Sequence, residues 1–460
     1  MRGTGSAAAV AGRHSSRGIA GIPPVGSYWR HAHRLAIILI AIIAVRLHEL
    51  LPMLRPLKPA LSVALVGLFF LLKNTKPRAI NALLRSKTFL LVLAYFAWAC
   101  LTVPFALWVG LAVSTVIVFI PALFMLTAIM LCPPTLRTLN LLQAGFVGAT
   151  AISAIALFAI GTGERLELAG SYDSNDTAAL MALCLPFALG LVFQGRGRER
   201  WIGLAAAALL AAAVVGTGSR GGTLAVLTGV LVFVLGLRGT RKIVMLGAAG
   251  VGGLLLWNFA TADFRSKMES LFRGEEDYNA TEYTGRKQIW ARAAIYIKAD
   301  PILGVGIGNF PVAEGEYLAS KGNRGKWSAT HNSYLQATAE LGIPGGILFT
   351  SVLLLAVVRA FPYWRLRGKG PSALSRHRPE LLASIGAFAV SSFFLSHAYY
   401  FVFFALVGFI ELATQALRAS EALAAGAPVV VVPPARRRDA FIPRRGPGYL
   451  PGELPPAPGR

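Results

Sequence analysis

Charged residues are scarce in this sequence. Asp, Glu, Lys and Arg make up 14% of its 460 residues, whereas apolar residues make up 55% and the mean hydropathy is +0.59. A soluble globular domain carries about 25% charged residues, so this composition excludes that class. It indicates an all-α membrane protein that crosses the bilayer several times.

Cysteine and acidic residues are also few. The cysteines are Cys100, Cys132 and Cys184, and their positions inside apolar runs favour neither a disulfide framework nor a zinc site. Lys and Arg number 45 against 21 Asp and Glu, a net charge of +24. The basic residues lie in short clusters between apolar runs and in both tails, which is typical of membrane topology. We therefore expect the lipid bilayer as a partner and no nucleic acid.

Apolar runs long enough to cross about 30 Å of hydrocarbon predict about twelve transmembrane helices. Arg46, His48 and Glu49 interrupt the first run, so a re-entrant hairpin is an alternative for the first two. The predicted spans are 35–54, 57–72, 89–104, 111–132, 139–160, 177–194, 201–216, 223–237, 243–260, 341–358, 381–396 and 398–418.

The basic clusters fall on alternate sides of these spans. The positive-inside rule then predicts that both termini are cytoplasmic and that one large loop, between spans 9 and 10, is extracytoplasmic. The N-terminal segment lacks a short apolar core with a small-residue cleavage site, so we expect no cleaved signal peptide. The predicted parts are a disordered cytoplasmic tail (1–34), membrane helices 1 to 9 (35–260), the extracytoplasmic loop (261–340), helices 10 to 12 (341–418) and a Pro- and Arg-rich disordered cytoplasmic tail (419–460).

The run TGSRGG, residues 217–222, puts Arg220 between two apolar segments. A guanidinium near membrane depth is costly unless it faces water, a protein interior or an anion, so Arg220 is a candidate site residue. An ordinary arginine in a loop between two spans is an equally weighted alternative.

Two segments of the large loop have helical signals. The run TGRKQIWARAAIYIKADP predicts a helix capped by Thr284, with Arg286 near its start, that ends before Pro301. The following GVGIGNF, residues 304–310, lacks GxGxxG spacing and indicates a tight turn or close backbone packing, not a nucleotide site.

The run THNSYLQATAELGIPGG, residues 330–346, predicts a second helix that leads into the tenth span. Thr330 or Asn332 would cap it, and Gly342 would mark a break. His331 would then lie at the mouth of the span, where a capping or buried histidine is the ordinary alternative.

Arg220, Arg286 and His331 fall on the same side of the membrane by this topology. Guanidinium groups bind phosphate oxygens bidentately and stay charged. A neutral imidazole can accept a proton from an attacking hydroxyl. Together they suit a substrate that presents a diphosphate at the outer boundary of the membrane, where no ATP is available, such as a polyprenyl-diphosphate-linked sugar.

The motifs TGSRGG, TGRKQIW with PILGVGIGNF, and HNSYLQATAELGIPGG resemble the O-antigen ligase and polymerase family of bacterial envelope glycosyltransferases. This resemblance implies an inner-membrane, metal-independent inverting transferase without a cofactor. It would move a glycan from undecaprenyl diphosphate to an acceptor hydroxyl on a glycolipid, glycan or protein. His331 would be the base or acceptor-orienting residue, and Arg220 and Arg286 would bind the diphosphate.

The resemblance adds further residues to the predicted substrate-binding set. Asn175 and Asp176 begin the sixth span, where capping of the helix outweighs contact with the site. Asn332 and Tyr334 flank His331 in the motif and complete the set.

Three aromatic residues stand in the last predicted hairpin. For His397, Tyr399 and Tyr400, a place in an interfacial aromatic belt outweighs a place in the site.

Two alternatives remain at this point. No residue of the sequence identifies the acceptor, so the sequence does not distinguish a ligase from a polymerase. A transporter of lipid-linked sugars or anions is a different class, although such proteins place their polar site at the midplane and carry internal repeats, neither of which the sequence indicates.

Overall fold

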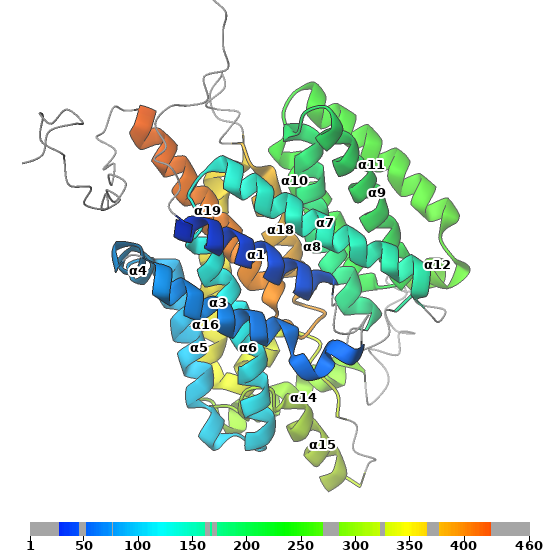
Figure 1. Cartoon of the computed structure of the whole chain (residues 1–460). Coiled ribbons are helices and arrows are strands. Elements are labelled where there is room, and N and C mark those ends of the chain that lie inside the picture. The colour runs from blue at the N-terminus through cyan, green and yellow to red at the C-terminus, as the bar shows by residue number, and fades with distance from the viewer. Residues whose placement is uncertain are drawn as a thin grey trace, which may run out of the picture. The chain divides into compact units, whose positions relative to one another are not determined.

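The computed structural model is built from helices (Figure 1). All residues that it describes lie in one compact unit, Ser27–Ala427. The expectation of an all-helical membrane protein is confirmed, since every regular element of the described residues is a helix. The described residues are 27–45, 52–75, 77–161, 166–167, 173–269, 285–322, 327–365 and 377–424.

Most helix bounds lie within a few residues of the predicted spans, because polar caps and positive-φ glycines, which hydropathy does not detect, set the first and last turns. Two differ more, since the first helix is Ser27–Val45 where 35–54 was predicted, and the tenth span, predicted as 341–358, lies in the longer helix Ser333–Trp364. The elements are α1 Ser27–Val45, η1 Pro52–Leu57, α3 Pro59–Asn74, α4 Pro77–Leu84, α5 Lys87–Leu101, η2 Val103–Phe105, α6 Val109–Met130, α7 Leu136–Ile160, α8 Ser174–Gln194, α9 Arg198–Thr217, α10 Arg220–Gly236, α11 Thr240–Phe259, α12 Ala262–Glu269, α14 Arg286–Ala299, α15 Phe310–Ser320, α16 Ser333–Trp364, α18 Pro379–Ser391 and α19 Phe401–Ala424.

Eight stretches of the described chain are long and apolar enough to cross a membrane. They lie in α5, α6, α7, α8, α9, α11, α16 and α19. Three shorter apolar helices, α3, α10 and α18, accompany them. The chain is therefore a multi-pass membrane protein.

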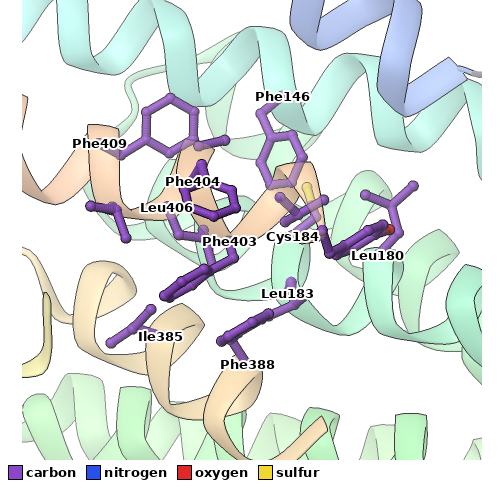
Figure 2. Packing of buried hydrophobic residues seen from close by; sticks show 14 of the residues in the cluster. Phe146, Leu180, Leu183, Cys184, Ile385, Phe388, Phe403, Phe404, Leu406 and Phe409 are labelled. Carbon is purple, nitrogen blue, oxygen red and sulfur yellow. The ribbon is translucent and has the colours of Figure 1, made fainter. Parts of the chain in front are cut away.

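Aromatic and aliphatic side chains of α7, α8, α18 and α19 fill the core. Figure 2 shows Phe146, Phe388, Phe403 and Phe409 packed between these helices. The rings of Phe388 and Phe403 stack with centroids 4.5 Å apart. This packing fixes α18 against α19, and therefore fixes the segment that joins them.

Helix α16 is broken near its start, as expected from the sequence. Gly342 has φ 68° and ψ −179° inside the helix. The polar groups that the break releases find partners, because Trp98 Nε1 donates to Leu341 O (2.8 Å) and Ile343 N donates to Pro301 O (2.8 Å). The first turns of α16 thus form a separate short segment that faces the loop residues.

Candidate functional site

Four helices begin at one end of the helix bundle. They are α8, α10, α14 and α16, and their N-caps are Asp173, Ser219, Gly285 and Asn332. The side chains of the first, second and fourth accept hydrogen bonds from backbone amides of the first turn, which is why these helices start at polar residues. The helix of the loop starts one residue later than predicted, since Gly285 is its cap and Thr284 lies outside the described residues.

The segment between α18 and α19, residues 392–400, is hereafter the 392–400 connection. It contacts the start of α16 through the main chain, because Ser333 N donates to Ser392 O (2.7 Å). Ser333 Oγ also donates to Leu395 O (2.7 Å) and accepts from His397 N (2.8 Å). Ser333 is fully buried, so these bonds fix the connection against the residue two positions after His331.

The helix starts that carry Arg220 and Arg286 both pack against Phe394 of the connection. Arg220 is the first residue of α10, and its neighbour Gly221 is so close to Phe394 that a Cβ there would lie 2.9 Å from Phe394 Cβ. Arg286 is the first residue of α14, and its Cζ lies 6.0 Å from the centroid of the Phe394 ring. Both arginines are partly buried. One aromatic side chain therefore brings together two helix starts that are 66 positions apart in the printed sequence.

His331 lies just before the N-cap of α16. Its φ of 48° is in the left-handed region, which is rare for a residue with a Cβ. Its backbone N donates to Ser396 Oγ of the connection (2.9 Å), and Trp290 Nε1 of α14 donates to Thr330 O (3.0 Å). Two other segments thus hold the backbone on which the imidazole is carried.

Asn175 and Asp176 do not cap α8, which corrects the expectation for them. Asp173 is the cap, because it lies one residue outside the helix, where its Oδ1 can reach both amides of the first turn. Asn175 Oδ1 instead accepts from Ser219 Oγ (2.9 Å), the cap of α10. Asp176 Oδ1 lies 2.8 Å from Nε2 of His397. The first turn of α8 is therefore connected to both the Arg220 turn and the 392–400 connection.

Asn332 and Tyr334 have structural partners of their own. Asn332 Oδ1 caps α16 by accepting from Tyr334 N and Leu335 N, both at 3.0 Å. The Tyr334 hydroxyl donates to Ala389 O of α18 (3.0 Å), and its ring packs on Phe393 with centroids 4.8 Å apart. These contacts hold the helix start that follows His331.

His397 and Tyr400 of the connection are buried, and Tyr399 is partly buried. His397 is 3% exposed and Tyr400 is 9% exposed, and their rings stack with centroids 4.1 Å apart. Tyr399 donates from its hydroxyl to Glu340 Oε2 (2.9 Å). The expectation of an interfacial aromatic belt is therefore wrong, because buried polar partners outcompete the lipid–water boundary for these side chains.

The glycine run after α14 packs closely against the membrane helices, as its sequence indicated. Gly306 has φ 93°, and a Cβ there would lie 2.3 Å from Ala106 Cβ. Glu340, which is 1% exposed, accepts from Gly308 N (2.8 Å) with the same carboxylate that binds Tyr399. Glu340 of α16 thus links the glycine run to Tyr399 of the connection.

A buried ion pair holds α14 and α15 together. Arg292 Nε on α14 donates to Glu314 Oε1 on α15 (2.9 Å), and both side chains are at most 5% exposed. The Tyr296 hydroxyl donates to Glu314 Oε2 (3.0 Å), and burial beside this carboxylate raises the pKa of Tyr296 well above its usual value. The pair sets the position of α14 and therefore of its first residue, Arg286.

The end of the bundle where these groups meet favours an anion. Each helix carries partial positive charge at its N-terminus, where free backbone amides point outward. Four such N-termini, together with Arg220 and Arg286, surround the 392–400 connection. Within the described part of the chain, no group of three or more His, Cys, Asp or Glu is placed to hold a metal.

Sequence reasoning missed the residues that join these parts. Phe394 and Ser396 belong to no recognised motif, and Ser219 and Glu340 stand inside motifs without a visible role of their own. The spacing of polar residues in SSFFLSHAYY, residues 391–400, could not identify Phe394 and Ser396, because their partners lie far away in the chain.

Comparison with known proteins adds two findings. Residues 205–350 match the family model described as O-antigen ligase, and this region contains Arg220, Arg286 and His331. The chain is also 26% identical over 292 residues to the exopolysaccharide production protein ExoQ of Rhizobium meliloti (strain 1021). That alignment covers 58% of this chain and 64% of the relative, so the chain spans less than two thirds of the length of that protein. Residues 205–350 of this multi-pass membrane protein are therefore similar to the O-antigen ligase family, and the chain is distantly similar to an exopolysaccharide production protein.

Proposed function

We propose that this protein is a membrane glycosyltransferase of the O-antigen ligase type. It moves a glycan from an undecaprenyl-diphosphate carrier to an acceptor hydroxyl at the extracytoplasmic face of the bacterial inner membrane. In this proposal the chain crosses the membrane twelve times with both termini in the cytoplasm, so that the 392–400 connection and the starts of α8, α10, α14 and α16 face outward.

The observation that carries the proposal is that three candidate residues from distant segments reach one connection. Arg286 lies over Phe394, Arg220 precedes the glycine packed on Phe394, and His331 N donates to Ser396. A diphosphate beside Phe394 would face two guanidinium groups and the N-termini of α10 and α14. Charge that develops on the leaving diphosphate is stabilised by such fixed positive groups, since they need no reorganisation during the reaction.

His331 serves the acceptor in this scheme. Its imidazole accepts the proton of the attacking hydroxyl or orients that hydroxyl toward the anomeric carbon. The bond from the acceptor oxygen forms as the bond to the diphosphate breaks, and a single displacement inverts the anomeric centre. Asn175, Asp176, Asn332 and Tyr334 hold the helix starts on either side, and His397 positions the connection through Asp176.

Polymerase activity is the second candidate, and the relation to an exopolysaccharide production protein favours it. The two reactions share the same donor and leaving group and differ in the acceptor. Purified protein incubated with undecaprenyl-diphosphate-linked glycan separates them. A ladder of lengthening lipid-linked glycans identifies a polymerase, and a new glycolipid or glycoprotein identifies a ligase. If the lipid-linked glycan only crosses the vesicle membrane without a new product, the protein is a transporter and the proposal fails.

A further inference from the structure

An apolar cavity, separate from the candidate functional site, lies at the opposite end of the bundle from the 392–400 connection. This cavity, of about 290 Å³, opens between α3, α4, α5 and α6. The path of α5 shows where this cavity lies. The start of α5 borders the cavity, whereas Leu107, which follows the end of α5, donates from its N to Val305 O in the glycine run. Its lining residues are almost all aliphatic or aromatic, among them Leu71, Leu83, Phe89, Leu123, Phe124 and Leu131.

One buried polar group in this lining lacks a partner. Thr75, the C-cap of α3, lines the cavity and is 8% exposed. Its hydroxyl oxygen has no hydrogen-bond partner among the described residues, although its backbone N donates to Leu71 O (2.8 Å). Buried hydroxyl groups are nearly always satisfied, so an isolated one beside an open cavity points to a ligand that supplies the missing partner.

Basic residues flank the same cavity. Lys73 stands two positions before Thr75, Arg85 follows the lining residue Leu84, and Lys87 stands two positions before Phe89. All three side chains are exposed. An apolar cavity with a hydroxyl at its wall and three cations beside it matches an amphiphile that has an apolar chain, an ester oxygen and an anionic head.

We propose that this cavity binds one acyl chain of an anionic phospholipid from the adjacent leaflet. The volume is close to the lower limit of about 300 Å³ for small-molecule pockets, which suits a single chain better than a whole lipid. The Thr75 hydroxyl donates to an ester oxygen of the lipid, and Lys73, Arg85 and Lys87 bind its phosphate. The lipid fills the space between α3 and α6 and holds the short helix α4 at the membrane surface.

Binding to the purified full chain tests this site. The detergent-solubilised protein is stripped of lipid and titrated with dioleoyl phosphatidylglycerol or dioleoyl phosphatidylcholine, and bound lipid is counted by native mass spectrometry. We expect one tightly bound phosphatidylglycerol, with about tenfold weaker binding of phosphatidylcholine. Equal binding of the two lipids by the unaltered protein overturns the proposal.

Three variants separate the parts of the site. Leu123→Trp fills the cavity and is expected to remove the tight site for both lipids. The near-isosteric Thr75→Val removes only the hydroxyl and is expected to weaken both about fivefold. The triple change Lys73→Gln, Arg85→Gln and Lys87→Gln is expected to remove the preference for phosphatidylglycerol while phosphatidylcholine binding stays.

Matched controls keep these results specific. Leu231→Trp places the same ring on an exposed face of α10 outside the cavity lining. A triple change of Arg196, Arg198 and Arg238 to Gln removes three exposed cations elsewhere at the same end of the bundle. Both controls should bind phosphatidylglycerol as the unaltered protein does. A control that loses the tight lipid, or a Thr75→Val variant that binds it unchanged, contradicts the assignment.

Discussion

Nε2 of His397 lies 2.8 Å from Oδ1 of Asp176, although 221 residues separate the two in the chain. This contact joins the 392–400 connection to the first turn of α8. The same connection holds the backbone of His331 and packs against the helix starts that carry both candidate arginines. The pair therefore links the first turn of α8 to the segment that holds the other parts of the proposed site.

Removing the Asp176 carboxylate should weaken the packing of the 392–400 connection against α8. Asp176→Ala leaves a buried imidazole nitrogen without its partner, which costs about 1–3 kcal/mol of stability. We expect a lower unfolding temperature and a kcat reduced by about tenfold, with KM for the lipid-linked donor little changed. Asp176→Asn retains an acceptor oxygen at the same place and should restore most of kcat. A purely structural role would lower the unfolding temperature of Asp176→Ala without changing kcat in the folded fraction.

Loss of any of the three candidate residues should abolish transfer. Arg220→Ala, Arg286→Ala and His331→Ala are each expected to lower the rate by at least about 100-fold, the usual cost of losing one group that stabilises a developing charge. Lys should restore either arginine poorly, because an ammonium lacks the bidentate fork. Transfer of glycan from the purified lipid-linked donor is the measurement.

The neighbouring Lys287 provides a matched control for these variants. It follows Arg286 on α14 and its side chain is exposed. Lys287→Ala should retain full activity at normal protein abundance. Full activity in all three candidate variants would rule out the proposed mechanism.

The ring of Phe394 should contribute to donor binding through Arg286. A cation over an aromatic ring gains about 0.5–2 kcal/mol. Phe394→Leu is therefore expected to raise KM for the donor by about 2- to 30-fold. Phe393→Leu is the comparison, since Phe393 is 52% exposed and packs on Tyr334 instead. Equal effects of the two changes would show that the ring acts through packing alone.

The ion pair between Arg292 and Glu314 should be sensitive to the loss of one partner only. Arg292→Met or Glu314→Leu leaves a buried uncompensated charge and is expected to cost about 3–5 kcal/mol. The double variant should recover most of this stability, because an apolar pair replaces both charges. A double-mutant cycle in thermal unfolding measures the coupling, and simple additivity would contradict a direct interaction.

Stability should fall on mild acidification because of His377. Its ring is buried and hydrogen-bonded to Gly236 O (3.0 Å), and burial lowers its pKa below the usual 6.5. The unfolded chain thus takes up a proton at a higher pH than the folded protein does. The stability that the neutral ring contributes is present above about pH 6.5 and decreases as pH falls from there toward the folded pKa. His377→Gln should reduce the pH dependence of the unfolding temperature over that window.

The sequence predicted most of the membrane helices because each depends on local composition, although eight described stretches, against twelve predicted spans, are long and apolar enough to cross a membrane. Apolar runs and flanking charges act within about 20 residues, which is the scale that hydropathy measures. The break at Gly342 and the close packing of the glycine run were also predictable, since glycine and proline restrict the backbone at their own positions.

The assembly of the site depends on contacts that no local pattern encodes. Ser396 binds the backbone of His331 from 65 positions away, and Phe394 contacts two helix starts. Serine and phenylalanine are ordinary residues in a membrane protein, so their types carried no signal. The same reason explains the error for His397, whose partner Asp176 could be identified only in three dimensions.

The position of the 392–400 connection has a consequence for biogenesis. It is synthesised after every other segment of the proposed site, and α18 and α19 must both be inserted before it can pack against α8, α10, α14 and α16. When residues 205–350 have been synthesised, the nascent chain still lacks the 392–400 connection against which their helix starts pack. On the proposed function, truncation before Ser392 should therefore give an inserted but inert protein.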